Sequence, residues 1–494
     1  MKKLLSLILA VTMVLTMGMA IAEEEPFVLT VMLPDFYTDY DFQVEDNPVL
    51  KHIEEATGCK LDITWVANSA YGDQISLTLA DPENMPMLIS LTGARDPIVI
   101  ETARAGAFWD LTDLIPEYEW LSQGPAGIYN NIAIDGNIYG IYRSRAYPRA
   151  GIYYRTDIAK EMGITEEPTT IEELTELAEA LASYSEDTYA LNMCKYVAGT
   201  INIITVAMGA PQTWGVDENG EIYPAHTDPA YFEGLTWLRH LYEIGGIDPD
   251  FMTIESGNWN DAERQSKAFM RFDCLDNGYR QQEWFEQNEG VTEDIWGLIP
   301  CVAKEDGSIT LWPQNPGFAG EIVVTKTVKE EDLDKVMAFL DWCNSPDGTT
   351  TLNWGVEGVT YFIREDGFRY STPSDDVDTT ASINTIQHSL NQLGMGVAGD
   401  FSPKASSTPL RDEYEYINNN YGKYAVSDPC YALTSETQVK LGATLSQMLE
   451  DAAVQYIAGI IDEDGLRAVW EQWAAEGGAQ ITAEYNDAYQ AIQG

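Results

Sequence analysis

The side chains that could take part in chemistry are scattered along the chain and form no recognised catalytic motif. The four histidines, at positions 52, 226, 240 and 388, show no HExxH zinc pattern and have no neighbouring cysteine. The sequence also lacks a nucleophile elbow, a phosphate loop, a dinucleotide fingerprint after the first strand and a calcium-binding loop. We therefore expect neither a metal site nor a cofactor.

Carboxylates are the remaining candidates for catalysis. With 79 acidic residues, pairs at the spacing that a glycosidase needs are unavoidable, so their presence carries no information. A general acid also needs an apolar setting that raises its pKa, and only Glu357 and Asp273 meet that condition. The sequence therefore favours binding over catalysis, and we expect that the protein is not an enzyme.

Aromatic residues indicate a ligand site. The chain has 13 tryptophans, and several of them lie where predicted helices and strands end. An indole ring stacks on the C–H face of a sugar, while nearby acids and amides bond the sugar hydroxyls. Packing in a core is the competing interpretation for each single tryptophan. The candidate ligand-binding residues are Trp214, Trp259, Asn260, Asp273, Trp312, Trp354, Glu357 and Tyr361.

The segment LNWGVEGVTY, residues 352–361, contains three of these candidates. Its two glycines interrupt any helix, and its polar residues do not suit a buried strand. We predict a loop that either completes the fold or forms part of the binding surface.

The order of the predicted elements places the candidates on an α/β scaffold. Strands are predicted over residues 27–33, 60–66 and 85–91, with helices over 48–58 and 71–80 between them. This alternation indicates an open sheet with right-handed crossovers, which binds ligands beyond the carboxyl ends of its strands. The pattern starts again at Gly151, so we expect a second α/β unit.

The later segments are mainly helical. The clearest helix spans residues 168–184, where Thr170 and Glu173 form a capping box. Further helices are predicted over 231–245, over 330–348 and in the final 60 residues, where Ser435 and Gln438 form a second capping box. The Asn-Gly pair at residues 219–220 predicts a hairpin.

The amino terminus predicts export. Lys2 and Lys3 precede an uncharged apolar stretch that ends in Ala20-Ile21-Ala22, which is typical of a cleaved signal peptide over residues 1–22. An uncleaved membrane anchor is the alternative interpretation. No later segment approaches 18 consecutive apolar residues.

The length and the net charge of the mature chain indicate its domain organisation and its possible partners. Cleavage would leave 472 of the 494 residues, which favours two lobes over one. Without the two leader lysines, 26 basic residues face 79 acidic ones, a formal charge of −53. Such a field repels nucleic acid and anionic membranes, does not help to recruit phosphorylated ligands and favours solubility outside the cell.

The six cysteines lie far apart in the sequence, which excludes CxxC redox and zinc-finger patterns. Export permits disulfides, whereas buried free thiols are the simpler interpretation. The sequence does not choose between them.

Six features, in order, are similar to one protein family. They are an export signal and the segments DGNIYGIY (135–142), 153–181, 216–251, 339–362 and WEQWAAEGGAQITAEYNDAY (470–489). Together, from about residue 27 to 490, they resemble the family 1 extracellular solute-binding proteins of ABC importers. The resemblance is strongest to the long, LplA-like group associated with oligosaccharides.

The resemblance implies a type II periplasmic-binding-protein fold, with two α/β lobes, an interlobe ligand cleft and a helical carboxyl-terminal region. It assigns residues 23–145 and 300–365 to the N-lobe and residues 146–299 and 366–494 to the C-lobe. The chain would cross between the lobes near residues 143–148, near 296–300 and after the 352–361 segment.

The same resemblance implies roles within the 352–361 segment. Gly355 and Gly358 would adopt positive φ, Trp354 or Tyr361 would face the ligand, and Glu357 would accept hydrogen bonds from sugar hydroxyls. Alternatively, Trp354 fills the lobe and Glu357 caps a turn.

On this resemblance the protein captures an oligosaccharide by lobe closure and delivers it to an ABC import permease. We expect a monomer whose partners are a small-molecule ligand and the permease subunits, with no nucleic acid. The acidic rim would meet basic permease loops. Gram-positive members usually carry a lipobox cysteine directly after cleavage, whereas Glu23 follows Ala22 here, so we expect a periplasmic or extracellular protein without a lipid anchor.

Three rival hypotheses stay open. The chain could be a secreted carbohydrate hydrolase or lyase that uses Glu357 or Asp273, or a sensor that presents its ligand to a histidine kinase. The ligand could also be a peptide or a polyamine, because an acidic protein suits a cation. For Trp312 and Trp354 we expect alanine to weaken binding without unfolding the protein; a large loss of stability would mark them as core.

Overall fold

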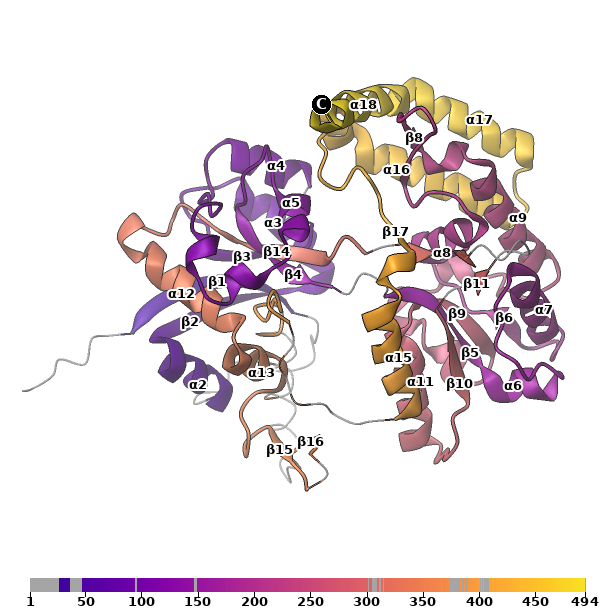
Figure 1. Ribbon diagram of the computed structural model, residues 1–494, viewed down its shortest axis with the longest axis horizontal. Coiled ribbons are helices and arrows are strands. Elements are labelled where there is room, and N and C mark those ends of the chain that lie inside the picture. Colours follow the sequence, from indigo (N-terminus) through magenta and orange to yellow (C-terminus); the bar gives the residue numbers. More distant parts are fainter. Residues whose placement is uncertain are drawn as a thin grey trace, which may run out of the picture.

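The computed structural model describes residues 26–35, 47–93, 96–145, 149–300, 302–303, 309–310, 312–313, 315–365, 367–372 and 408–493, and also residues 383, 386, 390–399, 401 and 403. The predicted signal peptide lies outside these residues. No helix in the described ranges is long and apolar enough to span a bilayer. Two separate sheets, each with its own helices, lie side by side (Figure 1).

The first sheet has five strands in the order β2-β1-β3-β14-β4. β1 pairs in parallel with both β2 and β3, and β14 runs antiparallel to β3 and β4. The strands are β1 (Phe27–Asp35), β2 (Cys59–Ala67), β3 (Leu88–Leu91), β4 (Gly140–Ser144) and β14 (Phe318–Val324). The helices of this half are α2 (Pro48–Thr57), α3 (Tyr71–Leu79), α4 (Pro97–Arg104), α5 (Ala126–Ile132), α12 (Leu333–Cys343) and α13 (Pro346–Trp354).

Both faces of this sheet are covered, and the alternation along β1 explains how. Leu29, Val31 and Leu33 lie in the core that α2 and α12 cover, whereas Met32 lies in the core under α3 and α4. Successive side chains of a strand point to opposite faces, so one strand contributes to two cores. We call this sheet with its helices the first lobe.

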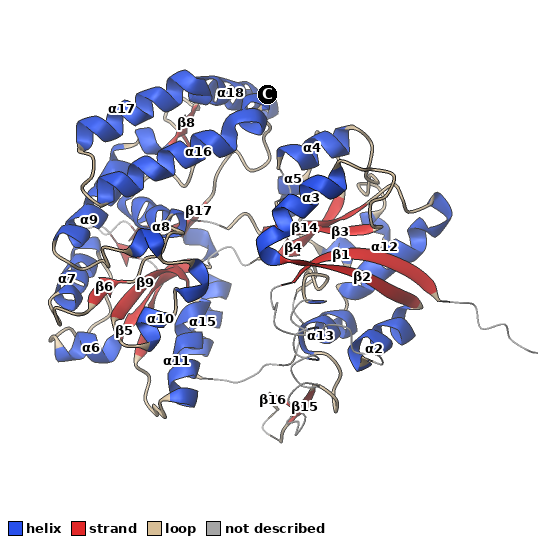
Figure 2. Ribbon diagram, turned by 180° about the vertical axis from the view of Figure 1, so that it is seen from behind, coloured by secondary structure: helices blue, strands red, loops and turns tan. Residues whose placement is uncertain are grey.

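The second sheet has four strands in the order β10-β5-β9-β6 (Figure 2). β9 and β10 run antiparallel to β5, and β6 runs parallel to β9. The strands are β5 (Ala150–Arg155), β6 (Tyr189–Leu191), β9 (Ala268–Cys274) and β10 (Trp296–Ile299). The helices packed around this sheet are α6 (Thr156–Glu161), α7 (Ile171–Ala182), α8 (Ala198–Met208), α9 (Pro229–Glu243), α10 (Asp261–Arg264), α11 (Asp276–Asn288) and α15 (Pro409–Asn420).

Three long helices complete this second lobe: α16 (Glu436–Ile457), α17 (Glu463–Trp473) and α18 (Ala479–Gln493). Tyr456 and Ile457 of α16 join the core that contains α7, α8 and α9. The remaining strands form short pairs: β7 (Trp214–Val216) with β8 (Ile222–Pro224), β11 (Val302–Ala303) with β12 (Ile309–Thr310), β13 (Trp312–Pro313) with β17 (Ala425–Val426), and β15 (Tyr361–Ile363) with β16 (Arg369–Ser371).

The chain passes between the two sheets more than once. β4 of the first sheet leads to β5 of the second, and β10 of the second leads back, through the short pairs, to β14 of the first. Ile386, Leu390 and Leu393 pack in the first lobe, whereas Trp312 packs in the second. The lobe boundaries given above at residues 145, 300 and 365 stay predictions.

Most of the predicted elements are confirmed. The alternation β1-α2-β2-α3-β3 is present, and so are α9, the β7–β8 hairpin and the helical end of the chain. The Thr170–Glu173 capping box is present in full. At α16 the Ser435 side chain caps the Gln438 backbone amide, which is one half of the predicted box; Glu484 of α18 separately accepts from Thr437 N at 2.8 Å.

One prediction is wrong in part. The 352–361 segment begins inside a helix, because Leu352, Asn353 and Trp354 form the last turn of α13. Ser345 caps that helix by accepting from Gly348 N, and Pro346 stands at its first position, so the helix restarts directly after α12. Gly355 ends it at φ 81°, and the expected positive φ is present there and at Gly358.

Candidate functional site

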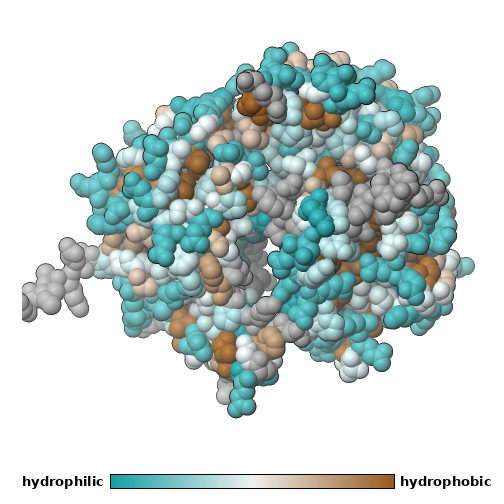
Figure 3. Space-filling view, in the orientation of Figure 1, coloured by the Kyte–Doolittle hydropathy of each residue, from teal (hydrophilic) through white to brown (hydrophobic). Residues whose placement is uncertain are grey.

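The strand directions place one edge of each sheet at the junction between the lobes. β4 ends at Ser144 and β5 begins at Ala150, so both strands meet the junction at these ends. Because β14 is antiparallel to β3 and β4, its first residues lie at the same edge as the ends of β3 and β4. In the second lobe, β9 and β10 end at that edge for the same reason. The molecular surface is hollowed between the two halves (Figure 3).

The first-lobe wall of this cleft contains a cavity of about 70 Å³. It is lined by Ser90, Thr92, Arg143, Ala319, Glu321 and Gln392, among others. Arg143 donates from Nε to the Ala319 carbonyl at 3.0 Å and from Nη1 to Gln392 Oε1. The guanidinium is thus held by neutral acceptors at the edge of the sheet.

The second-lobe wall carries a shared ion pair. Asp276, the first residue of α11, is 3% exposed and lies 3.2 Å from Arg149 Nε. Its other oxygen lies 2.9 Å from Arg280 Nη2. One buried carboxylate therefore forms ion pairs with two guanidinium groups. The same carboxylate also interacts electrostatically with Arg145.

Aromatic rings lie beside these arginines. Tyr279 and Tyr414 contact each other with ring centroids 5.4 Å apart, and the Arg411 guanidinium covers Tyr279 at 4.4 Å. Burial, followed by the charge of Asp276, raises the pKa of Tyr414 to about 12, so its hydroxyl stays protonated and can donate a hydrogen bond.

A buried polar network underlies the end of β9 and joins two of the sequence-predicted residues. Trp259 donates from Nε1 to the Asn192 carbonyl at 3.2 Å, and its ring lies under the Arg271 guanidinium at 4.4 Å. Asn260 Oδ1 accepts from Arg271 Nη2 at 2.6 Å. Arg271 pairs with the fully buried Glu263 at 3.1 Å. Trp259 and Asn260 are therefore fixed in place beneath the cleft edge.

Two further residues stand above this network. Asp273, the third predicted residue in this region, lies at the junction end of β9 and accepts from Asn277 Nδ2 at 2.7 Å. Tyr196 follows β6, is 54% exposed and packs edge-on against Trp259 with centroids 6.3 Å apart. Tyr196 is the most exposed aromatic ring at this edge among the residues described here, and it offers a face to a sugar.

Two predicted tryptophans lie elsewhere. Trp214 is 6% exposed and packs against Trp473 and Tyr485, beside a hollow of about 310 Å³. Trp312 is 3% exposed in the main core of the second lobe. These positions favour packing for both rings, and their ligand contact stays a prediction.

The three candidates of the 352–361 segment form a separate group in the first lobe. Trp354 ends α13, and its ring is covered by the Arg369 guanidinium. Tyr361 is buried in β15, and its backbone pairs with that of the exposed Glu357. Glu357 and Asp273 belong to different lobes, so the two candidate catalytic acids do not share one sheet edge.

Sequence reasoning missed the arginines of the cleft and Tyr196. The signal was present in RSRAYPR, residues 143–149, which carries three arginines in the predicted crossing segment of a strongly acidic chain. Tyr196 gave no signal, because a single tyrosine after a strand is common. Its exposure depends on how β6 and α8 are placed.

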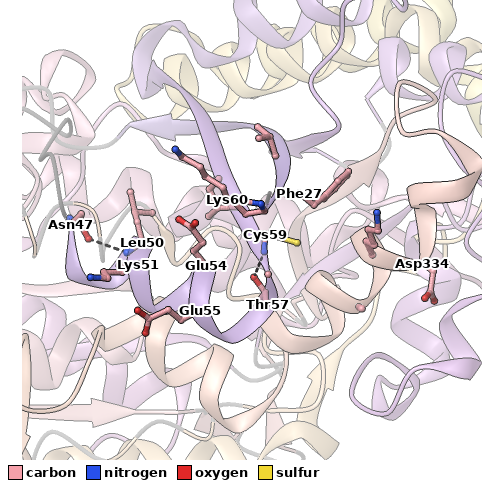
Figure 4. Close-up of a pocket in the computed structure, with 16 residues that line it drawn as sticks. Phe27, Asn47, Leu50, Lys51, Glu54, Glu55, Thr57, Cys59, Lys60 and Asp334 are labelled. Carbon is pink, nitrogen blue, oxygen red and sulfur yellow. Dashed lines mark hydrogen bonds between the residues drawn. The ribbon is translucent and has the colours of Figure 1, made fainter. Parts of the chain in front are cut away.

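A larger hollow, of about 1490 Å³, lies at the far edge of the first lobe (Figure 4). It is lined by Phe27, Lys51, Glu54, Thr57 and Cys59, which belong to α2 and the first residues of β1 and β2. Ligands of open α/β sheets bind beyond the carboxyl ends of strands, and this hollow lies at the opposite ends. We therefore assign the ligand site to the cleft.

Two negative observations apply to the part of the chain that the structure describes. It contains no group of three or more His, Cys, Asp or Glu side chains that could hold a metal ion. The five cysteines within it, all except Cys301, are free thiols.

Comparison with known protein sequences gives consistent matches. A family model described as bacterial extracellular solute-binding protein matches residues 42–263. Lipoprotein LipO of Bacillus subtilis is 29% identical over 90% of this chain and 89% of its own. The polygalacturonan/rhamnogalacturonan-binding protein YtcQ of the same organism is 27% identical, with 91% and 89% covered.

Solved structures show the same fold. The alginate-binding protein AlgQ2, without calcium ion, superposes with a TM-score of 0.69 at 19% identity, covering 94% of this chain and 98% of its own. A solute-binding protein from Bifidobacterium longum infantis, described as HMO-binding and ABC-transporter-associated, gives 0.71 at 15% identity, with 94% and 99% covered. Both likenesses support a fold of two α/β lobes.

Proposed function

We propose that the chain is an extracellular solute-binding protein that captures an oligosaccharide and delivers it to an ABC import permease, because the family model matches residues 42–263 and LipO is 29% identical over 90% of the chain. The observation that supports this proposal is the hollow between two α/β lobes, at the junction where β4 and β9 end and β5 begins. The relative named for polygalacturonan and rhamnogalacturonan binding supports a sugar ligand. The family binds solutes and is not enzymatic.

The cleft supplies the two kinds of contact that a sugar needs. Tyr196 offers an exposed ring for stacking, and Asp273 offers a carboxylate that can accept hydrogen bonds from hydroxyls. Oligosaccharide bound between the lobes would favour the closed arrangement, because only there do both walls contact it. Trp214, Trp312, Trp354, Glu357 and Tyr361 stay proposed ligand contacts of lower priority, since they lie away from this edge or within cores.

The remaining parts of the proposal concern the cell. We place the protein outside the cytoplasm, with residues 1–22 removed and no lipobox cysteine after Ala22, so that contact with its transporter retains it. It would act as a monomer, and the acidic surface would meet basic loops of the permease subunits. We keep residues 23–145 with 300–365 and residues 146–299 with 366–494 as the two lobes that close.

A thermal-shift screen of the full mature chain against neutral and acidic oligosaccharides tests the proposal. A ligand at a hundredfold excess over its Kd adds about 2.7 kcal/mol of stability and raises Tm by a few degrees. Calorimetry on the hit should give one site, and chromatography should recover the glycan intact. Conversion of the glycan to products would support a hydrolase or lyase, and a hit only among peptides or polyamines would overturn the sugar assignment.

A further inference from the structure

Positive charge gathers in the cleft of this acidic protein. Arg143 lies in β4, Arg145 and Arg149 lie in the segment that joins β4 to β5, and Arg280 lies beside Arg149 across Asp276. The chain has 28 basic residues against 79 acidic ones, so this group contrasts with the charge of the chain as a whole. It occurs at the point where the two sheet edges meet.

The carboxylates near this group do not neutralise it. Asp276 pairs with both Arg149 and Arg280, which leaves one negative charge for two guanidinium groups. Within the described ranges, neither Arg143 nor Arg145 forms an ion pair: Arg143 donates to Ala319 and Gln392, and Arg145 Nη1 donates to the Ser144 carbonyl at 2.9 Å.

The electrostatic effect on Arg143 agrees with this geometry. Burial, followed by the like charges of Arg145 and Arg149, lowers the pKa of Arg143 to about 9. Burial and Arg149 also lower the pKa of Arg145, although Asp276 opposes the change. A positive charge that is partly removed from water and poorly compensated is costly until an anion joins it.

Arg145 has the free geometry to receive that anion. It is half-buried, and the Ser144 carbonyl is the one acceptor of its side chain among the residues described, so Nε and Nη2 stay available. Its backbone is fixed by the bond from Arg145 N to the Gly317 carbonyl at 2.9 Å. A guanidinium fork of this kind matches the two oxygens of a carboxylate.

We infer that the ligand is an acidic oligosaccharide, and that Arg145, between Arg143 and Arg149, binds a carboxylate of one of its uronic acid units. The inference rests on the proposed function and names its substrate class. The net negative charge of the chain alone would predict a cationic ligand. Salt screens charges more than about 8 Å from the ligand, so the nearby guanidinium groups determine the local potential. The polyamine alternative loses support for the same reason.

Isothermal titration calorimetry of the full mature chain tests the inference. The probes are trimers of galacturonate, mannuronate and glucuronate, each compared with the carboxyl-reduced, neutral trimer of the same linkage. We expect at least one acidic trimer to bind at least about tenfold more tightly than its neutral counterpart. Reduction of the carboxylate removes the charge-assisted hydrogen bonds to the guanidinium group. Its affinity should fall as salt is raised.

Variants assign the contact to Arg145. Arg145→Gln should weaken the acidic trimer about tenfold and leave the neutral trimer unchanged, and Arg145→Lys should fall between them because it keeps the charge without the fork. Arg467→Gln is the matched control, since Arg467 is an exposed arginine of α17 that bonds Glu463 at 2.7 Å. Unchanged Tm values would show that each variant is folded.

The outcomes separate the two proposals. Equal binding of acidic and neutral trimers, or hits confined to neutral glycans, would overturn the acidic ligand and leave the oligosaccharide receptor standing. Tight acidic binding that Arg145→Gln does not weaken would overturn the role of Arg145. Absence of binding to every glycan, acidic and neutral, would overturn the proposed function itself.

Discussion

Arg104, the last residue of α4 in the first lobe, donates from Nη1 to Glu436 Oε1 at 2.8 Å, and Glu436 opens α16 of the second lobe. Arg104 also bonds Asp135 from Nε at 2.8 Å. One turn along α16, Val439 packs against the core of the first lobe. The two lobes therefore touch through a long helix as well as through the connecting strands.

This contact predicts a change in ligand affinity. We predict that closure of the hollow between the lobes separates Arg104 from Glu436, so that their ion pair favours the described arrangement. Both side chains are more than a third exposed, so Glu436→Gln should destabilise the described arrangement by only about 0.5 kcal/mol. We expect the affinity for the bound oligosaccharide to rise about twofold in calorimetry. Glu463→Gln, which removes an ion pair within α17, serves as control, and weaker binding of Glu436→Gln would contradict the prediction.

The substitution Trp312→Ala should lower the free energy of unfolding. The ring is 3% exposed in the second-lobe core, and truncation of a buried tryptophan costs about 3–5 kcal/mol. Urea unfolding of ligand-free protein measures this loss. A stable variant that binds its glycan poorly would instead support the ligand contact proposed from the sequence.

The substitution Tyr196→Ala should weaken glycan binding and leave the stability of the protein almost unchanged. The ring is 54% exposed, so its removal should change the free energy of unfolding by no more than about 0.5 kcal/mol. Loss of a stacking face should weaken the glycan by about three- to tenfold. Tyr184→Ala is the control, because Tyr184 is also exposed but precedes β6, at the other edge of the sheet. If both variants bind alike, Tyr196 is not a ligand contact.

His226 predicts a loss of stability in mild acid. It is 5% exposed against Trp473, with ring centroids 4.5 Å apart, and burial lowers its pKa from 6.5 to about 4. The unfolded chain therefore binds more protons between these values, so the contribution is present above pH 6.5 and is lost as the pH falls toward 4. The loss approaches about 3 kcal/mol.

The measurement is the difference in unfolding free energy between wild type and His226→Phe across this range. The variant lacks the titrating ring, so wild type should lose more stability than the variant as the pH is lowered from 6.5 to 4. Parallel curves would mean that His226 has the same pKa in the folded and in the unfolded state, which would contradict the prediction.

Local features of this protein follow from residues close together in the chain. The capping box of α7 joins Thr170 to Glu173, and the β7–β8 hairpin turns at Asn219-Gly220, so each is decided within a few residues. The strand-helix alternation of the first lobe depends on hydrophobic periodicity, which is also local. The single helix predicted over 330–348 is instead two, because α12 ends at Cys343 and Ser345-Pro346 starts α13, which continues to Trp354.

The candidate site depended on contacts that the sequence does not encode locally. Trp259 and Asn260 come together with Asp273 because α10 packs beneath β9, whereas Trp312, from an equally suggestive loop, lies in a core. Burial results from which elements meet, and elements far apart in the chain decide it.

The sequence by itself determined two α/β units, a helical end and a strongly acidic surface, because composition and periodicity act through neighbouring residues and through sums over the chain. Only the tertiary structure decided that Arg143 lines a cavity and that Arg149 shares the single carboxylate of Asp276 with Arg280. A ligand responds to the few charges within a Debye length, and a sum over the whole chain cannot show which charges those are.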